Sequence, residues 1–131
     1  MNRSGRYYRM TNGIRITVRP VFAPDHSDPV EPRFVLVYFI RIENVSDATV
    51  QLMTRHWDIH DDVAGASQVD GPGVIGEQPV LAPGDVHEYN SFCVLRGHSG
   101  WMEGWYEFRL ADDSTFHATI PRFILNTSLP A

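Results

Sequence analysis

The sequence contains no lysine, a single cysteine and no apolar run long enough to cross a membrane. One cysteine, Cys93, excludes an intramolecular disulfide. All eleven basic residues are arginine, and the formal net charge of −5 argues against a nucleic-acid or anionic-membrane partner, because such surfaces need a basic field. Residues 1–12 carry three arginines but no apolar segment of a signal peptide. These absences predict a cytoplasmic protein.

What recurs instead is the alternation of apolar and polar residues that is typical of β-strands. With 131 residues and 43% hydrophobic residues, the chain is long enough for one domain with a core. The segment 34–43 is almost entirely apolar at its start, which predicts a central strand covered on both faces. Turn residues separate the expected strands, which are 14–19, 34–43, 49–61, 67–70, 86–95, 101–110 and 115–124.

About seven such strands predict an all-β fold, a single β-sandwich of the immunoglobulin or fibronectin type III kind. We expect a flexible N-terminal segment over residues 1–12, the sandwich over 13–126 and a C-terminal tail over 127–131. The strand at 49–61 changes parity, since Val50 and Leu52 are even whereas Trp57 and Ile59 are odd. An inward face changes parity only through an extra residue, so we predict a β-bulge near residues 53–55.

The segment 71–79, Gly-Pro-Gly-Val-Ile-Gly-Glu-Gln-Pro, contains the G-x-G-x-x-G spacing of dinucleotide sites. That fingerprint needs a helix at its third glycine, and the prolines that follow exclude one. The glycines therefore either cradle a phosphate with backbone N–H groups or shape a loop by positive φ angles. Pro72 lacks an N–H, and Asp70 and Glu77 flank the loop with negative charge, which weighs against a phosphate.

Three polar side chains, His56, Asp58 and His60, alternate along one strand and are expected to share its outward face. Two imidazoles and a carboxylate are ligands that suit zinc or another divalent ion. Same-face neighbours lie about 6.6–6.8 Å apart along a strand, however, so the three cannot all reach one ion without rearrangement. The alternative is an ordinary polar face of a half-buried sheet, and we predict no metal site.

Trp101 and Trp105 are expected to point outward, because the other parity of their strand holds the apolar residues. Two exposed tryptophans indicate a contact surface for a second subunit or a partner protein. The alternative is that the N-terminal segment covers them with Tyr7 and Tyr8.

Residues for covalent or acid–base catalysis are scarce. The nucleophile elbow G-x-S-x-G is absent, and Cys93 follows Phe92 in an apolar strand, which favours a small core residue. The paired aspartates 61–62 and 112–113 lie in expected turns, where Asp serves backbone geometry. We therefore predict no catalytic residue and no cofactor.

Several segments together resemble the bacterial ApaG family. The segments that carry the resemblance are Ser27-Asp28-Pro29, Arg41-Ile42-Glu43-Asn44, Val50-Gln51-Leu52, Arg55-His56-Trp57, Gly73-Val74-Ile75-Gly76-Glu77-Gln78-Pro79, Leu81-Ala82-Pro83-Gly84, Met102-Glu103-Gly104 and Ile120-Pro121-Arg122-Phe123. The resemblance implies a fibronectin type III-like sandwich and a link to cobalt resistance and magnesium efflux. It also implies a nucleotide-phosphate site at Gly71, Gly73 and Gly76, with Arg55 and His56 either structural or on the ligand side.

These observations predict a non-enzymatic binding module that recognises a nucleotide polyphosphate or pyrophosphate, a partner protein, or both. Its cation-efflux link would be indirect. Two alternatives stay open. One is a metal-assisted enzyme that acts on nucleotide polyphosphates with His56 as acid–base. The other is a pure interaction subunit, as a homodimer or with another protein, whose interface includes Trp101 and Trp105.

Overall fold

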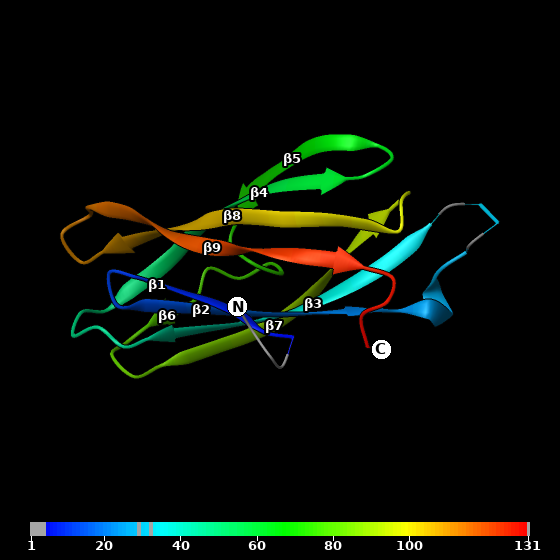
Figure 1. Ribbon diagram of the computed structural model, residues 1–131. Coiled ribbons are helices and arrows are strands. Elements are labelled where there is room, and N and C mark those ends of the chain that lie inside the picture. Colours follow the sequence, from blue (N-terminus) through cyan, green and yellow to red (C-terminus); the bar gives the residue numbers. More distant parts are fainter. Residues whose placement is uncertain (1–4, 29, 32, 131) are drawn as a thin grey trace.

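The computed structural model describes residues 5–28, 30–31 and 33–130. Over this part of the chain, nine strands form two antiparallel sheets that pack face to face (Figure 1). One sheet has the order β1-β2-β3-β7 and the other β5-β4-β8-β9, with β6 paired to β4. The predicted all-β sandwich is confirmed. Its elements are β1 (Tyr7–Thr11), β2 (Ile14–Phe22), the 3-10 turn η1 (Pro24–His26), β3 (Phe34–Asn44), β4 (Val50–Asp61), β5 (Gly65–Pro72), β6 (Val80–Leu81), β7 (Val86–Leu95), β8 (Ser99–Leu110) and β9 (Thr115–Asn126).

The core lies between the two sheets and follows the alternation of the sequence. Ile14, Ile16 and Val18 of β2 are fully buried, while the residues between them are half-exposed. The hydroxyl groups of Tyr89 and Tyr106 hydrogen-bond across the core and so connect β7 of one sheet to β8 of the other. The largest fully buried side chains are Tyr106, Phe108, Phe123, Ile14, Ile16, Leu36, Ile40, Ile42, Leu52, Leu95, Met102 and Ile120.

The predicted bulge in β4 is confirmed. The pairing of β4 with β8 shifts register between Leu52 and Thr54. After the shift Trp57 faces the core at 3% exposure, and the residues on either side of it face outward. A second shift, between Met102 and Gly104 in the pairing of β8 with β9, was not predicted. Both shifts adjust which side chains reach the outer face of this sheet.

Residues 7–11, which we expected to be part of a flexible segment, form strand β1 and pair with β2. The reason is the Asn12-Gly13 dipeptide, in which both residues have positive φ, 47° and 78°. Such a pair forms the two-residue turn that suits the twist of a β-hairpin. Residues 1–4 of the expected segment lie outside the described residues.

One long side of the sandwich is closed, because β9 of one sheet lies against β1 and β2 of the other (Figure 1). There the N–H of Thr119 donates to the hydroxyl oxygen of Thr11 at 3.2 Å. The outer face of β3, which we expected to be covered, is open, since Phe39 is 37% exposed. Beyond β9, Leu129 of the predicted tail packs against the core. No helix among the described residues is long and apolar enough to span a membrane.

Two buried polar side chains hold the loops. Asn44 is fully buried and Asp61 is 6% exposed. Burial by itself would raise the pKa of Asp61, but backbone N–H groups that include those of Arg96 and Val63 donate to its carboxylate and hold the pKa below its usual value. Asp61 therefore anchors the turn after β4 to the loop after β7.

Candidate functional site

The glycine loop, residues 71–79, is a small hairpin that continues from the end of β5. Val74 and Glu77 exchange two backbone hydrogen bonds of 2.8 and 3.0 Å. The two residues between them, Ile75 and Gly76, have φ angles of 47° and 75°, as the tightest hairpin turns require. The N–H of Gly73 donates to the carbonyl of Met53 in β4 at 2.9 Å. The loop is thus fixed to the sheet at its base.

Each glycine of the spacing has a structural reason. A Cβ on Gly71 would lie 2.8 Å from the guanidinium of Arg55, and a Cβ on Gly73 would lie 2.1 Å from the carbonyl oxygen of Glu77. Gly76 has open space around it, and its positive φ is the feature that favours glycine. The G-x-G-x-x-G spacing is therefore accounted for by the shape of the hairpin.

Arg55 points to the inner side of β4 and supports the loop from below. Its guanidinium donates to the carbonyls of Pro72 at 2.9 Å and Gly73 at 3.0 Å. Together with Tyr38, Tyr89 and other residues it lines a pocket of about 160 Å³ beneath the loop. The guanidinium thus already donates to protein carbonyls at the place where a phosphate would need it.

The residues that we assigned to a phosphate site do not converge. His56 lies on the outer face of β4, while Arg55 and the glycines lie on the loop side. The loop N–H groups of Gly73, Val74 and Glu77 donate within the protein. Across the described residues, the N–H groups of Ile75 and Gly76 find no protein acceptor. At the tip of the loop, these two adjacent N–H groups are available to an anion.

The outer face of the β5-β4-β8-β9 sheet carries stacked rings. The ring of Trp105 in β8 lies 5.0 Å from that of His56 in β4, tilted by 20°, and 3.8 Å from that of His117 in β9, tilted by 6°. Trp101 stacks on His60 at 5.5 Å, and the guanidinium of Arg122 lies 3.7 Å from the centre of the Trp101 ring. We call this surface the aromatic face; its residues are His56, His60, Trp101, Trp105, His117 and Arg122.

Hydrogen bonds and ion pairs fix the aromatic face in place. His56 Nδ1 lies 2.6 Å from Asp70 Oδ1, and its Nε2 lies 3.1 Å from Asp58 Oδ2. The bond to Asp70 raises the pKa of His56; partial burial opposes this and the contact with Asp58 adds to it. Arg122 donates to Glu103 at 2.6 Å. The imidazole of His56 is thus held between two carboxylates with both of its nitrogens engaged.

Trp101 and Trp105 point outward as expected, but Tyr7 and Tyr8 do not cover them. Tyr7 packs against Phe123 at the core, and Tyr8 is 70% exposed on the other sheet. The tryptophans are half-buried by the stacked histidines and Arg122. Their rings therefore form part of an ordered surface.

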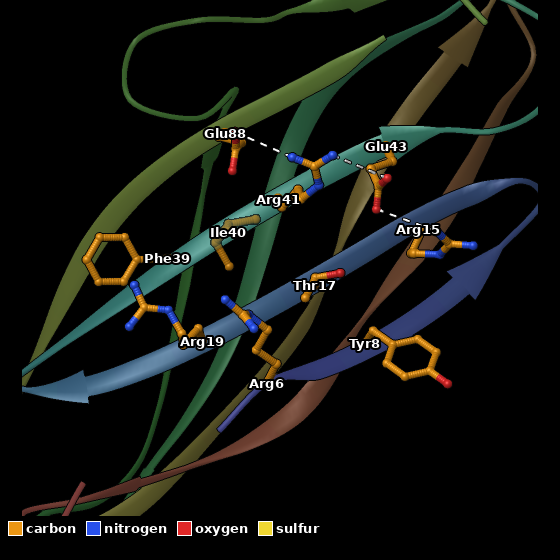
Figure 2. A pocket seen from close by; sticks show the side chains of 10 residues that line it. All are labelled: Arg6, Tyr8, Arg15, Thr17, Arg19, Phe39, Ile40, Arg41, Glu43 and Glu88. Atoms are coloured by element: carbon orange, nitrogen blue, oxygen red, sulfur yellow. Dashed lines mark ion pairs between the residues drawn. The ribbon is translucent and has the colours of Figure 1, made fainter. Parts of the chain in front are cut away.

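Sequence reasoning missed a hollow on the outer face of the other sheet. Arg15 and Arg19 alternate with apolar residues in β2, and this signal was visible in the sequence. Their meeting with Arg41 depends on the pairing of β2 with β3, which places Arg41 opposite Thr17. Figure 2 shows these side chains around the hollow, which we call the arginine groove. Its charged residues are Arg6, Arg15, Arg19, Arg41, Glu43 and Glu88.

Comparison with known proteins places the chain in a family. Residues 24–110 match the family model of the ApaG domain. The chain belongs to the ApaG family. Over 121 residues it is 46% identical to Protein ApaG of Sinorhizobium fredii, covering 92% of this chain and 93% of that protein, and it is equally similar to Protein ApaG of Rhodospirillum centenum. A crystal structure of the putative ApaA protein from Bordetella pertussis superposes with a TM-score of 0.85 at 35% identity, covering 92% of this chain and 95% of that one.

The ApaG match confirms the resemblance that the sequence suggested. It spans the glycine loop and both outward tryptophans, since residues 71–79, Trp101 and Trp105 all lie within 24–110. Three arginines of the arginine groove, Arg6, Arg15 and Arg19, precede the matched region. The groove is thus built partly from a segment that the ApaG domain model does not include.

Neither metal ligation nor thiol chemistry gains support from this ApaG-family structure. Among the described residues, no group of three or more His, Cys, Asp or Glu side chains could hold a metal ion. In the row that we considered as ligands, His56 is bonded to Asp58 and Asp70, while His60 pairs with Asp62 at 3.4 Å. Burial raises the pKa of the Cys93 thiol to about 11, which keeps it protonated near neutral pH.

Proposed function

We propose that the protein is a non-enzymatic binding module that contacts a partner protein through the aromatic face. The observation that supports this is the pair of stacks in which Trp105 lies between two histidines and Trp101 between His60 and Arg122. Tryptophan and arginine are the residues that most often dominate binding energy at interfaces. Stacking already restricts their rotamers, so little side-chain entropy remains to be lost on binding.

The charge around the aromatic face favours a partner segment with basic residues. Asp58 and Asp70 flank His56, and Asp62 pairs with His60 at the end of the strand. Asp62 and Asp70 are more than half exposed. A basic segment would meet these carboxylates while its apolar or planar side chains cover the tryptophan rings.

A pair of variants tests this proposal. Replacing Trp101 and Trp105 together by Ser removes both stacks, while Phe92→Ser removes an aromatic side chain that is 61% exposed on β7 of the opposite sheet. We expect wild type and Phe92→Ser to recover the same partner from the native cell extract, in quantitative mass spectrometry, and the double variant to lose it. The double variant must first show the far-ultraviolet circular dichroism of wild type. As a milder variant, Arg122→Gln changes one stack without touching the core.

Self-association is measured in parallel. A homodimer through the aromatic face predicts a sedimentation coefficient that falls in the double tryptophan variant and stays unchanged in Phe92→Ser. If wild type is monomeric and every recovered protein is retained by the double variant, the proposal is wrong.

The phosphorylated ligand that the resemblance implied is the second candidate. The free N–H groups of Ile75 and Gly76, above the pocket of about 160 Å³, favour a small anion there. Titration with pyrophosphate, followed by nuclear magnetic resonance, should shift these two amide signals first. Unchanged Ile75 and Gly76 signals at millimolar pyrophosphate would remove this candidate. On either proposal, the link to cobalt and magnesium is indirect and passes through the partner or the ligand.

A further inference from the structure

We infer that the arginine groove is a binding site for an oligophosphate anion. The groove is a hollow of about 720 Å³ over β2 and β3, on the outer face of the β1-β2-β3-β7 sheet (Figure 2). Its volume is in the range of small-molecule sites. The site is separate from the aromatic face, which lies on the other sheet, so it goes beyond the partner-binding function and does not depend on it.

The charge of the groove is opposite to that of the protein. Four guanidinium groups and two carboxylates line it, which gives it a formal charge of +2. Since the whole chain carries −5, the remaining residues carry −7. A concave basic surface on an acidic protein concentrates the local field and draws anions to this one place.

Two of the four arginines have no carboxylate partner in the part of the chain that the structure describes. Among the described residues, no Asp or Glu oxygen lies within 4.0 Å of the guanidinium nitrogens of Arg6 or Arg19. The guanidinium of Arg19 lies 4.4 Å from the centre of the Phe39 ring, which holds it over the sheet. Figure 2 shows the Arg6 side chain reaching across β2 toward Arg19. These two cations lack the counter-ion that an anionic ligand would supply.

The other two arginines are only loosely paired. Arg41 lies 3.5 Å from Glu43 and 3.5 Å from Glu88, and Arg15 lies 3.7 Å from Glu43. Charge-assisted hydrogen bonds are about 2.7–2.9 Å long, so these longer contacts, made by arginines that are 41% and 45% exposed, contribute little stability. Their N–H groups remain able to donate to a ligand.

The spacing of the groups favours an elongated anion. Arg15, Thr17 and Arg19 face the same side of β2 at intervals of two residues, so the outer two are about 13 Å apart along the strand. A single phosphate cannot contact both ends, whereas a chain of phosphate groups can contact several guanidiniums. Guanidinium groups suit phosphate because their N–H donors match its oxygens in pairs. The Thr17 hydroxyl lies midway as a further donor.

An acidic peptide would be the other polyanion to consider. The arginines come from three different segments, since Arg6 precedes β1, Arg15 and Arg19 belong to β2 and Arg41 belongs to β3. Arg15 and Arg19 form a row on β2, and Arg6 and Arg41 approach that row from neighbouring segments, so the four arginines border one hollow (Figure 2). This arrangement favours a short chain of phosphate groups, with its high charge density, over an extended peptide.

The test is calorimetric titration of the whole protein with sodium tripolyphosphate in magnesium-free buffer of low ionic strength. We expect Arg6→Gln combined with Arg19→Gln to weaken binding at least tenfold, taking about 1.4 kcal/mol or more for the loss of charge-assisted contacts. The control with the same change of charge is Arg33→Gln combined with Arg109→Gln, at two exposed arginines outside the groove. It should leave binding within about twofold, because surface charges so far from the ligand are screened.

A second test of the site is a variant that is expected to bind tripolyphosphate more tightly. Glu88→Gln removes one carboxylate that competes for Arg41, so it should tighten tripolyphosphate binding about threefold or more. A variant that merely damages the fold does not bind its ligand more tightly. Weaker or unchanged binding by Glu88→Gln would contradict the site.

Further titrations separate the sources of the anion. Pyrophosphate and ATP should bind through the same residues. Citrate should bind at least about tenfold more weakly, because it presents three carboxylates on a branched carbon skeleton instead of a linear row of phosphate groups. The proposal is overturned if tripolyphosphate gives no heat at millimolar concentration, if citrate binds equally well, or if ATP binds and tripolyphosphate does not. It is also overturned if the amide signals that shift belong to Ile75 and Gly76 and not to β2 and β3. That last outcome would favour the glycine loop instead.

Discussion

Replacing Asn44 by Ala should destabilise the protein more than any exposed substitution, because this buried amide uses all of its hydrogen-bonding groups. Its Nδ2 donates to the carbonyls of Ala48 at 2.8 Å and Leu81 at 2.9 Å. Its Oδ1 accepts from the N–H of Ser46 at 3.0 Å and from the Ser46 hydroxyl at 2.6 Å. The side chain therefore ties the turn after β3 to β6.

The size of the effect follows from these four bonds. A buried hydrogen bond contributes about 0.5–1.5 kcal/mol net, and the carbonyl of Leu81 would lose a buried donor, so we expect a loss of about 3 kcal/mol. For a chain of 131 residues, an unfolding entropy of about 2.1 cal/mol/K per residue converts this loss into a fall of about 11 °C in Tm. The urea midpoint should fall by about 1–2 M.

The measurement is urea unfolding followed by tryptophan fluorescence. Asn90→Ala, at an exposed position of β7, is the matched control and should stay within about 0.5 kcal/mol of wild type. Asn44→Asp should cost at least as much as Asn44→Ala, because a carboxylate would face the carbonyls of Ala48 and Leu81. If Asn44→Ala is as stable as Asn90→Ala, the amide does not hold this junction and the reasoning fails.

Two further predictions concern the aromatic face and the glycine loop. Asp70→Asn should lower the pKa of His56 toward its usual value of about 6.5, measured by nuclear magnetic resonance titration. Because the pKa of His56 is raised in the folded wild type, the stability lost in Asp70→Asn should be greatest below about pH 6.5 and vanish as pH rises through the folded-state pKa of His56. A difference in stability that does not depend on pH would contradict the bond between His56 and Asp70 as its cause. Gly73→Ala should lower the free energy of unfolding by about 3 kcal/mol in urea, because the new Cβ would lie 2.1 Å from the carbonyl oxygen of Glu77. The control Gly5→Ala has open space around it and should cost about 1 kcal/mol or less. Equal losses in the two variants would refute the close approach at Gly73.

Local alternation was enough to predict seven of the nine described strands and the bulge in β4, because burial on one face of a strand recurs at every second residue. The parity change between Leu52 and Trp57 placed the register shift correctly. The same logic placed Trp101 and Trp105 on the outer face. It failed at β1, where the Asn12-Gly13 signal was present but was not used.

Contacts between strands distant in sequence could not be predicted in this way. Nothing in the row His56, Asp58 and His60 indicates that Trp105 stacks between His56 and a histidine 61 positions further along the chain, at His117. The arginine groove has the same origin, since strand pairing brings Arg41 beside Arg15 and Arg19. The Arg55 side chain points inward and donates to a carbonyl of the glycine loop. This contact depends both on the bulge in β4 and on the position of the loop.

The position of Val74 changes what the glycine spacing signifies. Val74, between Gly73 and the Ile75-Gly76 turn, enters the core and is 1% exposed. A search for nucleotide sites by sequence pattern counts the glycines and ignores the residue between them. By that count, a chain with Asp at position 74 would score the same as this one, although its carboxylate would have to enter the hydrophobic core. In this fold the apolar side chain of Val74 fixes the loop to the core. The glycines on either side allow the backbone conformation that places Val74 there.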